Sequence, residues 1–275
     1  MQRLLTAAVL IPVALLAVFR LPGAWFLLCI VALLEIAVLE YVKVGEHWAP
    51  GGVLKSLLVS VPIVSVLLAG GLLPAGLASL DGALWWLALV LITVGSGALA
   101  ISARAPIEQG AAAVGLLAFG NLYFALPAAS LYRLRGFDPW VLVLLLAIVW
   151  LGDSGAYYIG KTWGRHKLAP RVSPNKTWEG SIASTAAGLL AAAVWSYWRL
   201  GEVDGWILLL AGLVSIAAQI GDLVESLLKR GAGVKDSGQI LPGHGGMLDR
   251  MDALLFAAPV MWLGVELLGA SRMLP

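Results

Sequence analysis

The segment ILPGHGGMLDRMD, residues 240–252, places glycines, a histidine, an arginine and two aspartates directly before an apolar run. Glycine permits positive φ and close backbone approach, and successive backbone N–H groups can form a nest that binds an anion. The aspartates offer carboxylates to a metal ion, and Arg250 offers a cation to phosphate. This combination predicts phosphoryl or nucleotidyl transfer, because such reactions depend on positioning and on neutralisation of phosphate charge.

A second group of acidic residues precedes this segment, in GDLVESLLKR. On a helix, Asp222, Glu225 and Lys229 share one face, and Asp249 and Asp252, three apart, share a face of the next helix. Three or four carboxylates that converge at a membrane boundary repel one another unless a cation neutralises them. Oxygen ligands favour Mg²⁺, so we expect a magnesium site here.

Two plainer explanations stay open at this point. The carboxylates would form only interhelical ion pairs with Lys229, Arg230 and Arg250, or the glycines of residues 231–248 would serve only as a flexible linker. This segment holds six glycines in eighteen residues, whereas average usage predicts about one. A linker has no need of the charged residues that lie among these glycines.

The stretch SPNKTWEG, residues 173–180, indicates a second functional loop. Its proline and its glycine bracket a rigid turn, Thr177 is a candidate cap for the following helix, and Glu179 is a carboxylate at the helix start. Ser173 and Lys176 would then face an anionic substrate. The alternative is simple attraction of a basic loop to the membrane surface.

The whole chain has the composition of a membrane protein, since 60% of its 275 residues are hydrophobic and 12% are charged. A helix that crosses a membrane needs about 20 mainly apolar residues. We therefore predict an all-α polytopic membrane protein with about nine transmembrane helices. The predicted spans are residues 3–19, 22–42, 53–70, 83–101, 110–128, 139–159, 181–199, 206–228 and 251–269. Residues 71–80 are too short to cross, so eight or ten spans stay open.

The distribution of charge predicts the orientation. With nine spans and a cytoplasmic N-terminus, thirteen Lys and Arg residues lie inside and five lie outside, as the positive-inside tendency expects. Loops 160–180 and 229–250 then face the cytoplasm. We expect residues 1–130 to form an N-terminal transmembrane region and residues 131–275 to form the catalytic region with both loops. A net charge of +2 gives no sign of a nucleic-acid partner.

Three segments resemble the phosphatidate cytidylyltransferases, also called CDP-diacylglycerol synthases. The run SLLKR, then KD, then LPGHGGMLDRMD is similar to the family signature throughout its 27 positions, residues 226–252. SPNKTWEG and DSGAY are similar to two further family segments upstream. The specific similarity covers about residues 150–255, and the earlier spans match only in being hydrophobic. One departure is Asn175, where many relatives have a second lysine, so this loop brings less charge to the nucleotide.

The resemblance implies that CTP and phosphatidate react to give CDP-diacylglycerol and pyrophosphate. It implies dependence on Mg²⁺, with room for a second cation, and a homodimer in the bacterial cytoplasmic membrane with its active site facing the cytoplasm. It assigns the metal to Asp222, Asp249 and Asp252, and completes the catalytic set with Lys229 and Arg250. The substrate-binding residues that it implies are Ser173, Lys176, Lys235, Asp236, His244, Gly245 and Gly246.

Two other functions compete with this one. A CTP-dependent polyprenol kinase would use similar phosphate-binding parts, and only the first reaction leaves CMP attached to lipid. An ion-coupled transporter, a different class of protein, would use Glu35, Asp153, Asp222 and Glu225 as an ion path. That function predicts polar residues across the membrane midplane, whereas most of the polar residues here lie near the inner ends of the spans.

Overall fold

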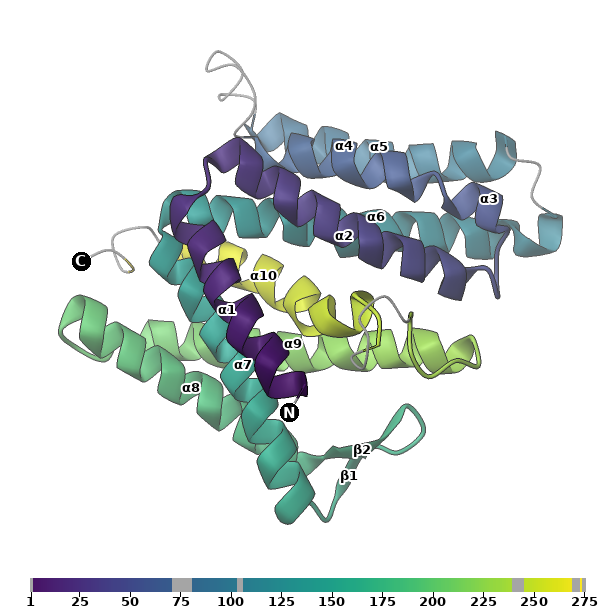
Figure 1. Cartoon of the computed structure of the whole chain (residues 1–275). Coiled ribbons are helices and arrows are strands. Elements are labelled where there is room, and N and C mark those ends of the chain that lie inside the picture. Colours follow the sequence, from purple (N-terminus) through teal and green to yellow (C-terminus); the bar gives the residue numbers. More distant parts are fainter. Residues whose placement is uncertain (1, 71–80, 103–105, 239–244, 269–272, 274–275) are drawn as a thin grey trace. The chain divides into compact units, whose positions relative to one another are not determined.

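The computed structural model describes all residues except 1, 71–80, 103–105, 239–244, 269–272 and 274–275 (Figure 1). The described part is built from helices and one short pair of strands. In chain order the elements are α1 (Gln2–Arg20), α2 (Gly23–Gly45), α3 (Gly51–Leu54), α4 (Leu57–Ala69), α5 (Asp81–Ser102), α6 (Ile107–Phe137), α7 (Pro139–Thr162), β1 (Lys167–Ala169), β2 (Ser173–Thr177), α8 (Trp178–Leu200), α9 (Gly205–Gly231) and α10 (Leu248–Leu268).

Each predicted span overlaps helical residues in the part of the chain that the structure describes. Among the described residues, five stretches are long and apolar enough to cross a membrane: α2, Gly51–Ala69, α6, α7 and α9. The chain is therefore a predominantly helical polytopic membrane protein. The count of nine spans and the cytoplasmic N-terminus stay predictions, and the short segment 71–80 lies outside the described residues.

The chain forms two compact units. Unit 1 combines Met1–Arg133 with Leu228–Arg250, and unit 2 combines Leu134–Leu227 with Met251–Pro275. The described residues between α9 and the start of α10, which exclude 239–244, therefore belong to the same unit as the N-terminal helices, although they lie far from them in the sequence. The sequence analysis divided the chain at residue 131 by expected function, whereas these two units are defined by contacts within the fold. The division at residue 131 therefore stays a prediction.

In unit 1, the core of α2 and α6 is centred on Tyr41. This side chain is 1% exposed, its ring lies edge-on to Phe124 at a centroid distance of 5.5 Å, and its hydroxyl donates to the Leu116 carbonyl at 2.9 Å. A Cβ on Gly120 of α6 would meet the side chains of Tyr41 and Leu57. This tight packing fixes the part of α2 that carries the neighbouring residue, Glu40.

In unit 2, α7 and α8 approach closely because small residues lie between them. A Cβ on Gly155 would lie 3.0 Å from the carbonyl oxygen of Ala183, and a Cβ on Gly180 would lie 2.9 Å from that of Ala156. Small residues of this kind allow helix backbones to pack inside a membrane, where hydrophobic exclusion does not drive association. The two helices therefore form a rigid wall for the residues at their polar ends.

The loop between α7 and α8 forms an antiparallel hairpin, whereas the sequence analysis predicted only a rigid turn between Pro174 and Gly180. Lys167 of β1 pairs with Thr177 of β2, and Ala169 pairs with Ser173, with an irregular register between them. Strand β2 continues directly into α8, where the Thr177 side chain accepts the N–H of Gly180 at 3.2 Å. The predicted helix cap is therefore confirmed, and it fixes β2 relative to α8.

Glu179 also holds the hairpin against α8. Its carboxylate accepts the backbone N–H of His166 at 3.2 Å and lies 2.6 Å from Nδ1 of that residue. Hydrogen bonds from its own backbone N–H, from the His166 ring and from the N–H groups of Arg165 and His166 lower the pKa of Glu179 from 4.5 to about 2. Its contribution to stability is therefore complete above about pH 4.5 and is lost only as the pH falls through about 2.

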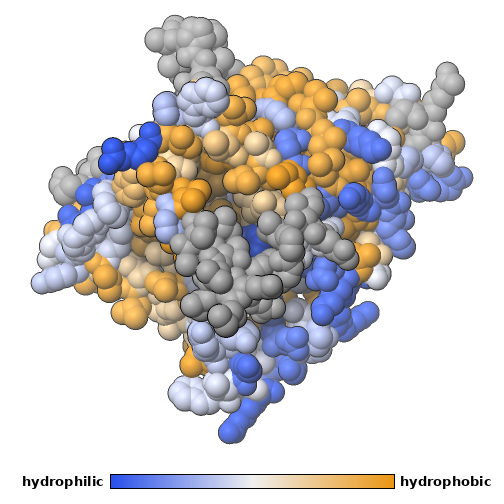
Figure 2. Space-filling model, in the orientation of Figure 1, coloured by the Kyte–Doolittle hydropathy of each residue, from blue (hydrophilic) through white to orange (hydrophobic). Residues whose placement is uncertain are grey.

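The helices expose apolar side chains, as expected for contact with lipid tails. Leu151 of α7, Leu190 of α8 and Leu213 of α9 are each at least half exposed. Hydrophilic side chains gather over the hairpin at the end of α7, at the bottom of the view in Figure 2. Unit 2 therefore has a polar end that carries the hairpin and an apolar surface along its helices.

Asp138 joins the opposite ends of α7 and α8. It is 7% exposed, accepts the N–H of Trp140 at 2.9 Å as the cap of α7, and lies 2.7 Å from Nη2 of Arg199. The Arg199 side chain is itself only 19% exposed. This nearly buried pair fixes the distal ends of the two helices relative to each other.

We predict that Asp138→Asn lowers the free energy of unfolding by about 3 kcal/mol, the lower range for breaking a buried ion pair. Asparagine keeps an acceptor for Trp140 and removes only the charge that faces Arg199. Thermal unfolding in detergent measures the change, with Glu202→Gln as a control on an exposed carboxylate in the loop after α8. Equal melting temperatures for the two variants would show that the ion pair adds nothing.

Candidate functional site

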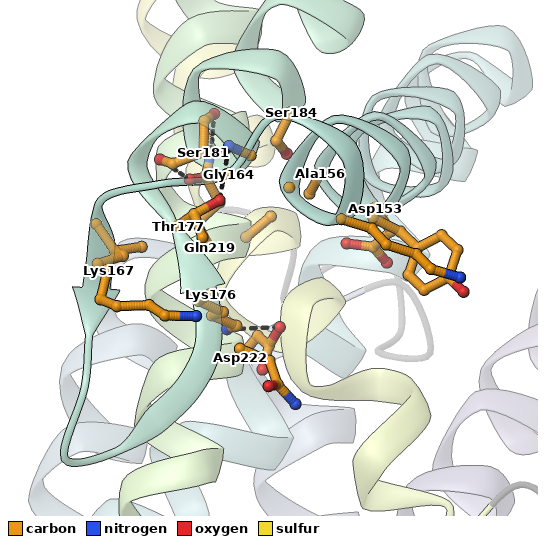
Figure 3. A pocket seen from close by; sticks show the side chains of 17 residues that line it. Asp153, Ala156, Gly164, Lys167, Lys176, Thr177, Ser181, Ser184, Gln219 and Asp222 are labelled. Atoms are coloured by element: carbon orange, nitrogen blue, oxygen red, sulfur yellow. Dashed lines mark hydrogen bonds and ion pairs between the residues drawn. The ribbon is translucent and has the colours of Figure 1, made fainter.

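Unit 2 contains a cleft between the hairpin and helices α7, α8 and α9, and several charged side chains line it (Figure 3). Its volume is about 630 Å³, within the range typical of small-molecule sites. The charged residues that line it come from four elements and are Asp153, Lys161, Lys167, Lys176 and Asp222. Three lysines and two carboxylates in one cleft suit a ligand that carries several phosphates together with a metal ion.

Lys176 and Asp222 form the central ion pair of this cleft. Nζ of Lys176 lies 2.6 Å from Oδ2 of Asp222. Figure 3 shows the Lys176 side chain extending from β2 toward Asp222 of α9. Asp252, near the start of α10, interacts electrostatically with Asp222, Asp153 and Lys176. Asp222 and Asp252 therefore both interact with this lysine, and Asp153 lines the same cleft, so carboxylates that could hold a divalent cation lie beside the lysines.

A hydrogen-bond network fixes α9 against α8 beside this pair. Nε2 of Gln219 donates to the Thr185 hydroxyl at 3.1 Å, and the Ser181 hydroxyl donates to Oε1 of Gln219. Because both ends of the amide are bonded, its orientation is fixed. Gln219 lies three residues before Asp222 on α9, and α8 follows directly from the strand of Lys176. The network thus sets the positions of both partners in the ion pair.

Unit 1 holds a second group of predicted residues, around Asp249. Its Oδ1 pairs with Nζ of Lys229, and its Oδ2 accepts the N–H groups of Gly246 at 2.8 Å and Ser237 at 3.2 Å. Gly245 has a φ of 79°, a left-handed conformation that glycine adopts without a steric cost. The pair of Lys229 with Asp249 is the interhelical ion pair that the sequence left open as a plainer explanation.

Glu40 of α2 binds the same segment, a contact that was not predicted from the sequence. Its Oε2 accepts the Ser237 hydroxyl at 2.9 Å and the Leu248 N–H at 2.8 Å, and its Oε1 accepts the Met247 N–H at 3.1 Å. A carboxylate near the end of an apolar span signals that a partner exists. It does not identify that partner.

The structure places the predicted site residues in two groups. The group in unit 2 is Lys176, Asp222 and Asp252, and the group in unit 1 is Lys229, Gly245, Gly246 and Asp249. Ser173 lies on β2 but is not among the described residues that line the cleft. Lys235, Asp236 and Arg250 are exposed, and His244 lies outside the described residues. The catalytic and binding roles of all these residues stay predictions.

The sequence did not assign several residues of the cleft to the site, although their spacing on α7 was a usable signal. Asp153, Tyr157 and Lys161 follow one another at intervals of four residues and line the cleft together. Residues four apart share one face of a helix. Lys167 gave no such signal, because its place depends on the hairpin pairing.

No group of three or more His, Cys, Asp or Glu side chains within the described ranges forms a preformed metal cage. Mg²⁺ does not need one, because it keeps several waters and binds through one or two carboxylates and substrate phosphates. Asp222 and Asp252, which interact in unit 2, fit that requirement. Asp249, the third ligand implied by the resemblance, is paired with Lys229 in unit 1, and its metal role stays a prediction.

The similarity to known proteins covers almost the whole chain. The chain is 38% identical to the phosphatidate cytidylyltransferase of Pseudomonas aeruginosa, over 94% of each chain. It is 33% identical to the protein of the same name from Haemophilus influenzae, over 94% of this chain and 96% of the relative. The match to the Brucella suis phosphatidate cytidylyltransferase is 46% identical but spans only 57% of this chain and 59% of that relative.

A model of the cytidylyltransferase family matches residues 1–268, which include the apolar helices before residue 150 as well as the cleft residues and the group around Asp249. The family predicted from the sequence is therefore confirmed. This chain belongs to the cytidylyltransferase family.

Proposed function

We propose that this chain transfers CMP from CTP to phosphatidate, giving CDP-diacylglycerol and pyrophosphate. The observation that supports this most directly is the pair of Lys176 with Asp222, in a cleft that two further lysines line. The names of the relatives supply the substrate class, since they are phosphatidate cytidylyltransferases. The apolar helices of unit 2 suit a substrate that stays in the membrane.

In the proposed reaction, an oxygen of the phosphatidate phosphate attacks the α-phosphorus of CTP. A new P–O bond forms, and the bond from the α-phosphorus to the bridging oxygen breaks, so that the electron pair leaves with pyrophosphate. Lys161, Lys167 and Lys176, which line the cleft, stabilise the negative charge that the phosphates carry. When CTP binds, Lys176 leaves the Asp222 carboxylate and pairs with a phosphate oxygen instead.

We propose Mg²⁺ as the cofactor, with Asp222 and Asp252 as its protein ligands in unit 2. When bound, the ion supplies positive charge to the triphosphate and polarises its P–O bonds. Release from Lys176 would free the Asp222 carboxylate to hold the ion. A second cation beside the first is compatible with the third carboxylate, Asp153, which interacts with Asp252.

We also propose that the protein lies in the bacterial inner membrane with nine spans, as a homodimer, and with its N-terminus and hairpin in the cytoplasm. The excess of basic residues in loops 160–180 and 229–250 supports this orientation, because such residues favour the cytoplasmic side. CTP is a cytoplasmic nucleotide, so this orientation gives it direct access to the cleft.

Purified protein in detergent, supplied with CTP, phosphatidate and Mg²⁺, tests the reaction. We expect a label on the α-phosphate of CTP to enter the lipid and a label on the γ-phosphate to leave in pyrophosphate. A γ-label in the lipid would identify a lipid kinase instead, in agreement with the polyprenol kinase alternative. If neither label separates from CTP, the proposed function is wrong.

Lys176→Met is expected to lower kcat/KM for CTP by about 100-fold or more, because it removes one preorganised cation from the phosphate site. Arg171→Met is the matched control. It removes a cation from the exposed turn of the same hairpin, outside the residues that line the cleft, and it should change the rate by less than about twofold. Similar losses in both variants would mean that overall hairpin charge matters and that the cleft geometry does not.

Asp222→Asn tests the metal assignment. We expect the Mg²⁺ concentration that gives half-maximal rate to rise at least about tenfold, because a neutral amide is a much weaker ligand than a carboxylate. Rates are measured against Mg²⁺ at fixed CTP, with Glu266→Gln as a control on an exposed carboxylate of α10. An unchanged Mg²⁺ requirement would exclude Asp222 as a ligand.

A further inference from the structure

Glu40 is a fully enclosed carboxylate in a helix that is long and apolar enough to cross a membrane. Its side chain is 1% exposed and lies between the apolar residues Leu39 and Tyr41 of α2. An ionised carboxylate at such a place is strongly unfavourable unless partners satisfy it. The identity of those partners therefore indicates what the residue does.

The three groups that donate hydrogen bonds to Glu40 all lie in the segment before α10 or at its first residue. They are the Ser237 hydroxyl and the backbone N–H groups of Met247 and Leu248, which lie 197 to 208 residues away in the sequence. The first N–H groups of a helix have no partner within the helix, and negative charge is favourable there. Glu40 therefore acts as a helix cap that another helix supplies.

Two glycines of the segment provide the space that this contact requires. A Cβ on Gly238 would overlap the Glu40 carboxylate, and a Cβ on Gly246 would overlap both Glu40 and the Ser237 hydroxyl. The positive-φ glycines among the described residues do not include these two. Their requirement for glycine is therefore steric; Glu40 causes it at Gly238, and Glu40 together with Ser237 causes it at Gly246.

The Glu40 contact adjoins Asp249 along the backbone. The N–H of Gly246 is donated to Asp249, and those of Met247 and Leu248 are donated to Glu40. Three successive N–H groups are thus held by two carboxylates of unit 1. Any shift of Glu40 moves the peptide that carries Asp249, and with it the contact to Lys229.

We propose that Glu40 is a positioning residue for CMP transfer: it fixes Ser237 and the first residues of α10 so that Asp249 stays aligned with Lys229. This inference rests on the proposed function. It assigns a role in the reaction to α2, a helix for which the sequence analysis predicted only a transmembrane span.

Glu40→Ala and Glu40→Gln test this role through the separation of kcat from KM. We expect Glu40→Ala to lower kcat by about 100-fold, because a mutation far from the chemistry that misplaces a site residue by about 1 Å can have an effect of that size. The KM for CTP should change by less than about threefold, since the cleft residues of unit 2 are intact. Glutamine keeps one acceptor oxygen and should give an intermediate kcat. Glu108→Gln, an exposed carboxylate at the start of α6, is the control.

A double-mutant cycle with Gly238→Ala tests the steric link. Gly238→Ala alone should lower kcat about as much as Glu40→Ala, because its methyl group displaces the carboxylate. In the Glu40→Ala background that methyl group has room, so the double variant should be no slower than Glu40→Ala. Additive losses would overturn the link. Gly52→Ala, which has no atom within 4 Å of its new Cβ, is the control.

Hydrogen exchange gives a readout that does not depend on activity. In Glu40→Ala the amides of Met247 and Leu248 should exchange faster, while those of α8 stay as in the wild type. Unchanged exchange, or faster exchange with an unchanged kcat, would overturn the positioning role. If the wild type transfers no CMP, the proposed function fails, and the exchange data still decide whether Glu40 holds α10.

Discussion

An ionised carboxylate among apolar helices needs a cation or a set of N–H groups, and this constraint shapes both units. In unit 2, Asp222 is paired with Lys176 at 2.6 Å. In unit 1, Asp249 is paired with Lys229 and two backbone N–H groups, and Glu40 takes one hydroxyl and two N–H groups. These contacts hold strand to helix and loop to helix, so the polar interactions set the geometry that the apolar packing supports.

The same constraint makes the cleft of unit 2 suitable for an exchange of partners. Before substrate binds, the Lys176 cation and the Asp222 carboxylate neutralise each other. In the proposed reaction a nucleoside triphosphate would bring negative charge and a metal ion positive charge, so that Lys176 would pair with phosphate and Asp222 would be available to hold the ion. Each charge would then have a partner before and after binding, and neither group would be left desolvated and alone. A cleft lined only with lysines would lack this balance when empty.

The helices were predictable because a membrane permits few alternatives for an apolar run of about 20 residues. The cap at Thr177 was predictable because capping depends on local residue type. The hairpin was not, since β1 has only three residues and its pairing with β2 leaves no periodic pattern. Lys176 was assigned to substrate from its loop, but its partner on α9 depends on tertiary packing. Glu40 was missed for the same reason, because its donors lie 197 to 208 residues away.

The glycine-rich segment illustrates how one residue type serves several physical needs within a few positions. Glycines before an apolar helix suggested a nest for phosphate, yet Gly238 and Gly246 leave the space that the Glu40 carboxylate fills, and Gly245 adopts a φ of 79°. The N–H groups of residues 246–248 are directed at Asp249 and Glu40. An internal carboxylate satisfies a helix start as a phosphate does, because both are anions that accept several N–H groups. The segment therefore encodes the contact of its own last residues with Glu40 of α2, and a substitution at Gly238 or Gly246 disturbs this contact as well as any chemistry that the segment performs.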